Sequence, residues 1–293
     1  MRFKDKFISD GSYDRSTARL AAGGDTQPED SYGETYVATA TESNKILLLA
    51  AMHADVVHRN AVHSLHMSSF DITGAFLHVK LDKKNSPRQI VMMIDPHIPH
   101  LMAGKWIEVV GCVYGLKQSN HIFGEDFSHT ILSAGFAHTT DPAILVKIDS
   151  ADPSKKCVVS THVDDGLSIH THQPFHDQLM QVLIARYDPL TIDPEASSYI
   201  GTTLVRHPNG VFTADMKGYI ERSLHDLGMD DIPGALTPLL PDNFHDSVNC
   251  SPADKALYRK NMGVGVYLLK AHHDVRKEII HLSPWMTCAS LST

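Results

Sequence analysis

Apolar residues recur with a helical period in several parts of the chain. Phe123, Phe127 and Ile131 repeat every four residues, with Ser119 as the expected N-cap and Gly135 at the expected end. The same kind of spacing predicts helices over four further segments: residues 45–57, 174–188, 216–227 and 256–271.

Short runs rich in β-branched and aromatic residues separate these helices and predict strands. They cover residues 90–94, 106–110, 143–148, 157–169, 199–206 and 211–214. A strand is also expected over residues 66–72, which form a short segment with little helical character, and a short one over residues 18–22. Asp164-Asp165-Gly166 interrupts the run over 157–169, and turn residues inside an apolar run predict a hairpin with both carboxylates at its tip. The order of elements predicts an α+β domain whose helices cover one face of an antiparallel sheet and leave the other face open for a ligand.

The bulk composition is that of a globular protein. The 293 residues are 42% hydrophobic and 20% charged, enough for one large domain or two modest ones. The longest apolar run, Ile46 to Met52, is too short to cross a membrane, and the N-terminus lacks the apolar stretch of a secretory signal. We therefore expect an intracellular protein that does not associate with a membrane.

Cysteine and histidine usage argues against a dedicated structural metal site. The four cysteines form no Cys-x-x-Cys pair, so neither structural zinc nor a disulfide framework is expected. The 20 histidines are dispersed, and the pair His272-His273 has no second pair near it. A histidine-based metal-binding protein is kept as an alternative.

The formal net charge of −8 opposes a nucleic-acid-binding function, which a basic excess usually accompanies. The conflict is reduced if positive charge is concentrated locally, or if a basic partner region lies outside this chain.

Three aspartates have the placement that two-metal phosphoryl transfer requires. Asp71 ends a predicted strand, and Asp164 and Asp165 lie at the tip of a predicted hairpin. Two divalent ions can stabilise the attacking, leaving and equatorial oxygens, and Mg²⁺ needs only two or three converging carboxylates because it keeps several waters. The alternative is a solvated turn, in which Asp is favoured for its own backbone hydrogen bonds.

Three motifs, in order along the chain, resemble the reverse transcriptases of copia-type retrotransposons. Asp71-Ile-Thr-Gly-Ala-Phe-Leu77 resembles that family's D-(V/I)-x-x-A-F-L, Val113-Tyr-Gly-Leu-Lys-Gln118 resembles (L/V)-Y-G-L-K-Q, and Thr161-His-Val-Asp-Asp-Gly166 resembles the Y-V-D-D turn. Shorter matches, from Gly24-Asp-Thr-Gln27 to Tyr258-Arg259, extend the resemblance over nearly the whole chain. It implies a polymerase palm with fingers and a partial thumb or connection region.

The resemblance also implies residue roles. Asp71 and Asp164 would bind two Mg²⁺ ions, with Mn²⁺ as a substitute, Asp165 would assist them, and the Ile72 backbone would complete the coordination at the triphosphate. The nucleotide contacts would come from four residues: Phe76 as a steric gate against a 2′-hydroxyl, Tyr114, Gly115 and Arg19. The primer grip would comprise Tyr199, Ile200 and Gly201. Each role has a structural alternative. Phe76 would be an ordinary core residue, Tyr114 a half-buried strand residue, Gly115 a turn residue and Arg19 a surface residue. The segment from Tyr199 to Gly201 would be only the start of a hairpin.

Some positions depart from the family pattern. His162 stands where the turn often begins with Tyr, Asn120 and Phe123 stand where Pro and Trp are usual, and Gly23 replaces a residue that many members have as basic. We expect fingers, palm and primer-grip hairpin over residues 1–235, and a partial thumb or connection region over 236–293 that leads toward a missing RNase H domain. The chain is therefore expected to be a fragment of a larger polyprotein or a decayed genomic copy.

The leading hypothesis is an RNA-directed DNA polymerase that adds deoxynucleotides to a primer 3′-hydroxyl. Its expected partners are an RNA or DNA template with primer, deoxynucleoside triphosphates, and the rest of a Pol polyprotein, including integrase and RNase H. The expected location is a cytoplasmic virus-like particle or the nucleus. The alternatives are a catalytically inactive relic that at most binds nucleic acid, and the unrelated metal- or histidine-binding protein.

Overall fold

In the computed structural model, the chain folds into two compact units. The first comprises Met1–Ala40 and Met52–Glu195, and the second Thr41–Ala51 and Ala196–Thr293. The structure describes residues 2–7, 13–19, 21–40, 42–59, 61, 64–97, 100, 102–199, 202–207, 212–229, 231, 251–269 and 275–282. The domain boundary expected between residues 235 and 236 lies outside the described residues and stays a prediction.

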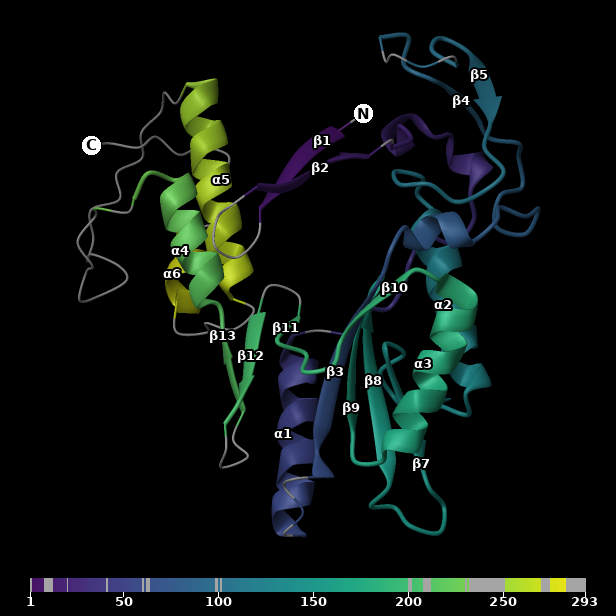
Figure 1. The fold of residues 1–293 in the computed structure, drawn as a ribbon. Helices are drawn as coiled ribbons and strands as arrows, with labels where there is room; N and C mark the ends of the chain where they lie inside the picture. The colour runs from purple at the N-terminus through teal and green to yellow at the C-terminus, as the bar shows by residue number, and fades with distance from the viewer. Residues whose placement is uncertain are drawn as a thin grey trace. The chain divides into compact units, whose positions relative to one another are not determined.

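A six-stranded antiparallel sheet forms the centre of the first unit (Figure 1). Its strands lie in the order β10 (Leu190–Asp193), β3 (His66–Ile72), β9 (Asp165–His170), β8 (Lys156–His162), β7 (Ile144–Ile148) and β6 (Ala137–His138). Because neighbouring strands run in opposite directions, the end of β3, the end of β8 and the start of β9 meet at one edge of the sheet. The expected α+β class is confirmed.

Two helices, α2 (Ser119–Ser133) and α3 (Gln173–Tyr187), lie side by side against one face of this sheet (Figure 1). Along the chain the principal elements run β3, α2, β8, β9, α3, β10, with β6 and β7 inserted before β8. This is the split βαβ arrangement, in which two crossover helices share one face of the sheet.

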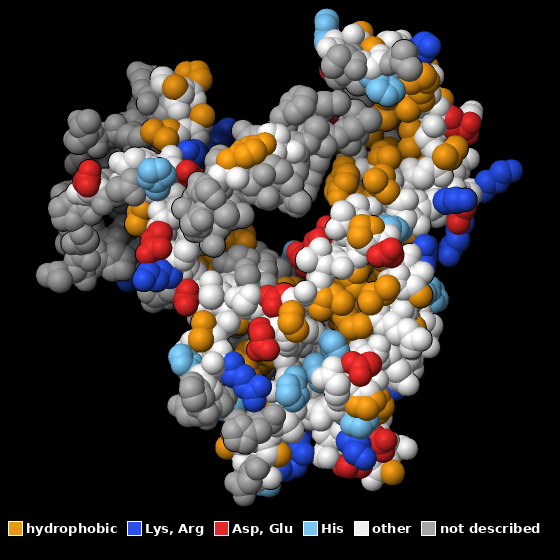
Figure 2. All heavy atoms as spheres, in the orientation of Figure 1, with side chains coloured by type: hydrophobic (Ala, Val, Ile, Leu, Met, Phe, Trp, Pro, Cys, Tyr) orange, Lys and Arg blue, Asp and Glu red, His pale blue; other side chains and the backbone are white. Residues whose placement is uncertain are grey.

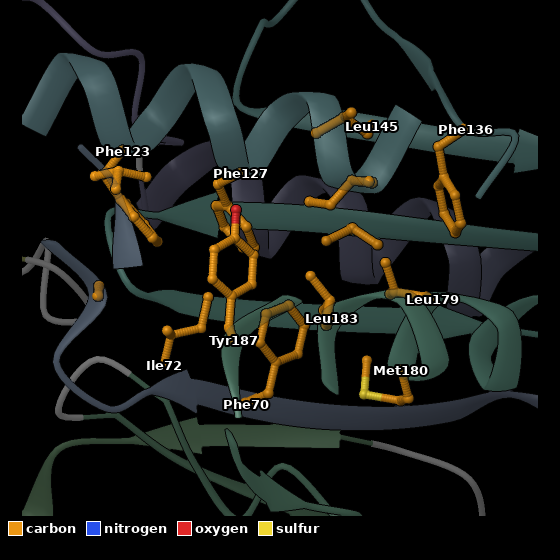
Figure 3. Close-up of a cluster of buried hydrophobic side chains, with 14 of the residues drawn as sticks. Phe70, Ile72, Phe123, Phe127, Phe136, Leu145, Leu179, Met180, Leu183 and Tyr187 are labelled. Carbon is orange, nitrogen blue, oxygen red and sulfur yellow. The ribbon is translucent and has the colours of Figure 1, made fainter. Parts of the chain in front are cut away.

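The main hydrophobic core lies between the sheet and these two helices (Figure 3). Phe70 of β3 packs edge-on against Phe127 of α2, with ring centroids 6.3 Å apart. Tyr187 of α3 is fully buried, and its hydroxyl donates a 2.6 Å hydrogen bond to Asp126 of α2. Each fully buried large side chain contributes roughly 1.5–3 kcal/mol to stability, so the core fixes β3 rigidly against the helices.

The second face of the sheet is covered over most of its length. Residues 52–58 of α1 (Glu42–His58) belong to the first unit, and Asp55 there accepts a 2.9 Å hydrogen bond from Lys156 of β8. Val158 and Ile169 pair across β8 and β9 on the same face as Lys156, and they are only 5% and 0% exposed. The expectation of an open face was therefore wrong over most of the sheet. At the end near the hairpin tip Asp71 is exposed, and at the far end Ile148 of β7 is 52% exposed.

Two hairpins complete the described strands of the first unit. β1 (Arg2–Phe7) pairs with β2 (Tyr13–Arg19), and β4 (Val91–Met93) pairs with β5 (Trp106–Glu108). The second unit contains β11 (Ser198–Tyr199), β12 (Thr202–Arg206) and β13 (Phe212–Asp215) in one small sheet, with α4 (Lys217–Asp226), α5 (Pro252–Leu268) and α6 (Arg276–Leu282). None of the helices that the structure describes is both long and apolar enough to cross a membrane.

Several boundaries differ from the prediction. Ser119 does not cap α2: Gln118 occupies the cap position, and the Ser119 hydroxyl donates to the carbonyl of Val113 instead. The single strand expected over residues 199–206 is two strands, β11 and β12, which pair with each other. The expected short strand at 18–22 ends at Arg19 and begins earlier, at Tyr13.

Candidate active site

The sheet register brings two of the three expected aspartates face to face. Asp71 of β3 lies directly opposite Asp165 of β9, a position in which Cβ atoms stand roughly 4.5–5.5 Å apart. The next residue on β3, Ile72, donates its backbone amide to the carbonyl of Asp164 at 3.0 Å. Segments more than ninety positions apart in the sequence are thus joined at one sheet edge.

The turn that presents Asp164 has an unusual backbone. Val163 has φ of 58°, a left-handed value that is a genuine outlier for a β-branched residue. A positive φ at the first central residue, followed by a negative one, is the φ pattern of the type II′ turn favoured in two-residue hairpins. Such a residue costs about 1–3 kcal/mol and persists only where its surroundings hold it in place, often at functional sites.

Alternation along the strands separates the carboxylates from the core. Phe70 and Ile72 are 3% and 1% exposed and pack among α2 and α3, so Asp71 between them points to the opposite face. Asp165, opposite Asp71, projects to that same face. On this face the pair is accessible: Asp71 is exposed, and Asp165 is half-buried.

A neighbouring glycine fixes this register. Gly166 lies opposite Phe70, and a Cβ added at Gly166 would stand 2.0 Å from the tip of that ring. The phenyl ring therefore lies over the glycine, the arrangement in which an aromatic cross-strand partner covers a residue without a side chain. Asp71 and Asp165 occupy the next pair along the same ladder, so this contact also determines their opposition.

The donor set matches a hard divalent cation in its chemistry. Asp71, Asp164 and Asp165 offer only oxygen, which Mg²⁺ prefers. Like charges directly opposite one another destabilise a strand pair, and a bound cation relieves that repulsion. Within the described part of the chain, no three His, Cys, Asp or Glu side chains are grouped so that they could hold an ion. As they stand in the structure, Asp71, Asp164 and Asp165 therefore do not form a metal-binding group.

Phe76 and Tyr114 lie together at one end of the core. Phe76 belongs to the short helix η4 (Ala75–His78), which follows β3 directly. Its ring is half-buried and meets Tyr114 edge-on at 4.9 Å and Phe123 at 6.1 Å. Phe76 is thus packed against the core and partly accessible, an arrangement consistent with the core alternative and with a steric gate.

A close backbone crossing joins two of the sequence motifs. Ala22 donates its amide to the carbonyl of Tyr114 at 2.7 Å, and Gly115 has φ of 93°. A Cβ at Gly115 would lie 2.1 Å from the carbonyl oxygen of Ala22, and one at Gly24 would lie 1.8 Å from that of Gly115. Both glycines are required for this approach. The close neighbour of Gly115 here is the chain itself.

Two glutamines that sequence reasoning did not assign strengthen this crossing. Gln27 donates to the side chain of fully buried Gln118 at 2.9 Å and accepts the amide of Lys117 at 3.1 Å. Each of these glutamines is the last residue of a sequence motif, Gly24-Asp-Thr-Gln27 in one case and Val113-Tyr-Gly-Leu-Lys-Gln118 in the other. The spacing of the motifs does not indicate that the two side chains meet.

The remaining predicted contacts are less defined. Arg19 ends β2 and pairs in register with Arg2, but its side chain is not among those described. Tyr199 ends β11 in the second unit and is 7% exposed. Ile200 and Gly201 lie outside the described residues.

A pocket of about 530 Å³ lies between the segment 22–31 and β4–β5. Val91 and Trp106 are 54% and 68% exposed there, and hydrophobic side chains gather over this hairpin on the face that Figure 2 shows. Residues 79–117, which include the hairpin, carry six basic and three acidic residues in a chain of net charge −8. Positive charge is therefore concentrated locally, beside an exposed aromatic surface.

Comparison with known proteins establishes the class. A family profile described as "Reverse transcriptase (RNA-dependent DNA polymerase)" matches residues 3–241, and the chain belongs to that family. The chain is 23% identical over 170 residues to the putative transposon Ty5-1 protein of Saccharomyces cerevisiae. It is 24% identical over 288 residues to the Retrovirus-related Pol polyprotein from transposon RE1 of Arabidopsis thaliana.

These matches confirm the resemblance to copia-type retrotransposon Pol proteins. They cover 58% of this chain for the yeast protein and 97% for the plant protein. The aligned part is 53% of the length of the yeast protein and 18% of the length of the plant polyprotein. The activity and partners of those longer proteins are therefore considered as proposals for this chain.

Proposed function

We propose that this chain is an RNA-directed DNA polymerase that works as part of a retrotransposon Pol polyprotein and adds deoxynucleotides to a primer 3′-hydroxyl. The observation that carries the proposal is the register pairing of Asp71 with Asp165, beside the Asp164 turn, in a chain of the reverse transcriptase family. In this account the first unit contains the palm and fingers, and the second contains the primer grip and a partial thumb or connection region.

Asp71, Asp164 and Asp165 are the residues that would hold two Mg²⁺ ions, for which Mn²⁺ can substitute. When bound, such ions stabilise the charge that develops on the transferred phosphoryl group. Because β3 is packed rigidly against the core, Asp71 keeps a fixed position relative to the hairpin tip. A fixed position of this carboxylate favours precise positioning of the primer terminus.

The nucleotide and template sites are proposed around the same sheet edge. Phe76 and Tyr114 form one wall for the incoming deoxynucleotide, with Phe76 as the steric gate and the Ile72 carbonyl nearby. Gly115 shapes this wall through its backbone crossing. The exposed ring of Trp106 and the local basic charge suit an unpaired template strand, because bases stack on aromatic rings and phosphates attract cations.

A primer-extension assay tests the proposal. The wild-type chain is given a template-primer, deoxynucleoside triphosphates and Mg²⁺ or Mn²⁺, next to Asp164→Asn and the matched control Glu125→Gln. Glu125 is exposed on α2, the helix that packs on the opposite face of the sheet from Asp71. We expect metal-dependent extension in the wild type and the control. Loss of a metal-binding carboxylate removes several kcal/mol of transition-state stabilisation, at least about 100-fold in rate.

Two other outcomes distinguish the alternatives. Template-primer binding without extension in a folded wild-type sample supports the inactive relic. Extension that Asp164→Asn leaves unchanged assigns the activity to other residues and refutes the proposed site.

A further inference from the structure

The short helix η4 carries Phe76 and is a weak support for it. It is a four-residue 3-10 helix, a geometry whose hydrogen bonds are poorer than those of an α-helix. It follows Gly74, whose φ is 68°, and its residue Leu77 is 66% exposed. A single helical turn is marginal by itself, so the position of the Phe76 ring depends on contacts that neighbouring elements make with η4.

The C-terminal end of α3 supplies such contacts. Arg186 donates from Nη2 to the backbone carbonyl of His78, the last residue of η4, at 3.2 Å. A cationic donor is favourable there, because the last carbonyls of a helix carry partial negative charge. Tyr187 meets the His78 ring edge-on, with ring centroids 5.6 Å apart. The end of η4 is therefore attached to α3 through its backbone and through its side chain.

A carboxylate of α2 orients this guanidinium. Asp126 accepts hydrogen bonds from Nη2 of Arg186 at 3.0 Å and from the hydroxyl of Tyr187 at 2.6 Å. The guanidinium carbon also lies 5.2 Å from the centroid of the Tyr187 ring, which is fully buried. The Arg186 side chain is 40% exposed, and an ion pair this exposed adds little to stability. Its removal should therefore leave the fold intact while it releases η4.

These contacts lie at the same end of the sheet as Asp71. α3 leads into β10, whose first residue, Leu190, pairs with Ile72 at the end of β3. At that end the Phe76 ring meets Tyr114 at 4.9 Å. The ring is thus placed by two independent contacts, an aromatic neighbour at the ring itself and the guanidinium of α3 at the helix that carries it.

A steric gate works by repulsion, so its selectivity depends on where its ring is held. Misplacement of a group in an active site by about 1 Å can change a rate about 100-fold. A shift of η4 away from α3 would give a 2′-hydroxyl more room without any change in Phe76 itself. Ribonucleotides should gain from such a shift, whereas deoxynucleotides, which do not meet the gate, should not.

We propose that Arg186 is a positioning residue that holds η4 in place, so that Phe76 excludes ribonucleoside triphosphates. The inference rests on the proposed function, because it assumes that Phe76 lies beneath the incoming sugar. Arg186 acts through Phe76 and not by contact with the nucleotide.

Single-nucleotide incorporation by the full chain, with each deoxynucleoside triphosphate and its ribonucleotide counterpart, tests this inference. The samples are the wild type, Arg186→Gln, Phe76→Val, the double variant and a control, Arg59→Gln. Arg59 is a matched control, because its guanidinium also binds a partly exposed carboxylate, that of Asp55, at 2.8 Å. The measured quantity is kcat/KM for the deoxynucleotide divided by kcat/KM for the ribonucleotide.

Arg186→Gln should lower this ratio about tenfold, through better use of ribonucleotides, and Arg59→Gln should leave it unchanged. In the Phe76→Val background, where the gate is already reduced, Arg186→Gln should have no further effect, because the two residues act through one contact. A general structural defect would instead lower both efficiencies together.

The outcomes separate the two proposals. A wild-type ratio in Arg186→Gln, a parallel loss of both efficiencies, or an equal effect of Arg186→Gln with and without Phe76 overturns the inference and leaves the proposed function intact. A folded wild-type chain that incorporates no nucleotide overturns the proposed function and this role with it. Asp126→Asn keeps an acceptor for the Tyr187 hydroxyl but removes the charge that orients Arg186. It should lower the ratio in the same direction, which keeps the test decisive if Arg186→Gln does not fold.

Discussion

Gly166→Ala is the substitution that most sharply probes the register behind the carboxylate pair. The added methyl would lie 2.0, 2.4 and 2.7 Å from three atoms of the Phe70 ring, whereas ordinary contact begins near 3.4 Å. Phe70 is 3% exposed and packed against Phe127, so it has little room to move. Overpacking of this kind costs about 3 kcal/mol of unfolding free energy.

A double-mutant cycle isolates the contact. Phe70→Leu shortens the opposing side chain and should cost about 1–2 kcal/mol by itself. In that background Gly166→Ala should cost less than about 1 kcal/mol, a coupling of about 2 kcal/mol. Urea unfolding followed by circular dichroism measures each free energy. The control is Gly218→Ala in α4, where an added Cβ meets nothing within 4 Å and the change should be neutral or stabilising by up to about 1 kcal/mol.

The result bears directly on the active site. A one-residue slip between β3 and β9 would move every side chain of one strand to the other face, separating Asp71 from Asp165 as well as Phe70 from Gly166. Equal costs of Gly166→Ala in the two backgrounds would refute the register, and with it the pairing of the carboxylates.

Three other substitutions probe interactions within the first unit. Gly115→Ala places a methyl group 2.1 Å from the carbonyl oxygen of Ala22, at a residue whose φ is 93°. The amide of Ala22 should therefore lose its protection from hydrogen exchange. Unchanged exchange at Ala22 would argue against the backbone crossing. Tyr187→Phe removes the hydroxyl bonded to Asp126 and should lower the unfolding free energy by about 1.5–3 kcal/mol in urea titrations, and a cost below about 0.5 kcal/mol would contradict the bond. Burial lowers the pKa of His170 from 6.5 to about 4, so the unfolded chain takes up this proton first as pH falls. The free energy of unfolding should be constant above pH 6.5 and fall toward pH 4 by up to about 3 kcal/mol. The variant His170→Gln should flatten this pH dependence between pH 7 and 5. An unaltered slope in the variant would show that other groups cause the pH dependence.

The elements that carry the site were accessible from sequence because their signals are local. The strand over residues 66–72 was predicted with the bounds that β3 has, because this segment is short and has little helical character. The hairpin at Asp164 followed from turn residues inside a longer apolar run, and β8 and β9 flank it as expected. Local chemistry was sufficient for the ends of these strands.

Features that depend on distant segments were not predicted. β10 has a mixed pattern with exposed Thr191 and Ile192, and it exists as a strand because β3 offers a free edge. The cover that α1 provides through Asp55 and Lys156 is also a tertiary contact. In the same way, the required glycines at 24 and 115 reflect two backbones that meet in space.

For the candidate site, the sequence predicted that three aspartates converge on a pair of metal ions. The register places Asp71 opposite Asp165, but the three carboxylates are not grouped as a metal site in the structure, and their role as metal ligands stays a prediction. The sequence did not indicate that His162 lies opposite Asp165, because a departure from a family motif reads as a loss until the cross-strand neighbours are known. The roles of Arg19, Ile200 and Gly201 stay predictions from the resemblance.

The central claim is that Asp71 and Asp164 act as one unit in nucleotide addition, and single-turnover incorporation on a template-primer tests it most directly. The rate is measured for Asp71→Asn, Asp164→Asn and the double variant, with Glu125→Gln as the control. Each single substitution should slow addition at least about 100-fold, and the double variant should be no slower than the slower single one, because groups that hold the same ions are strongly non-additive. Penalties that multiply in the double variant, or single variants that keep the wild-type rate, would contradict a shared site.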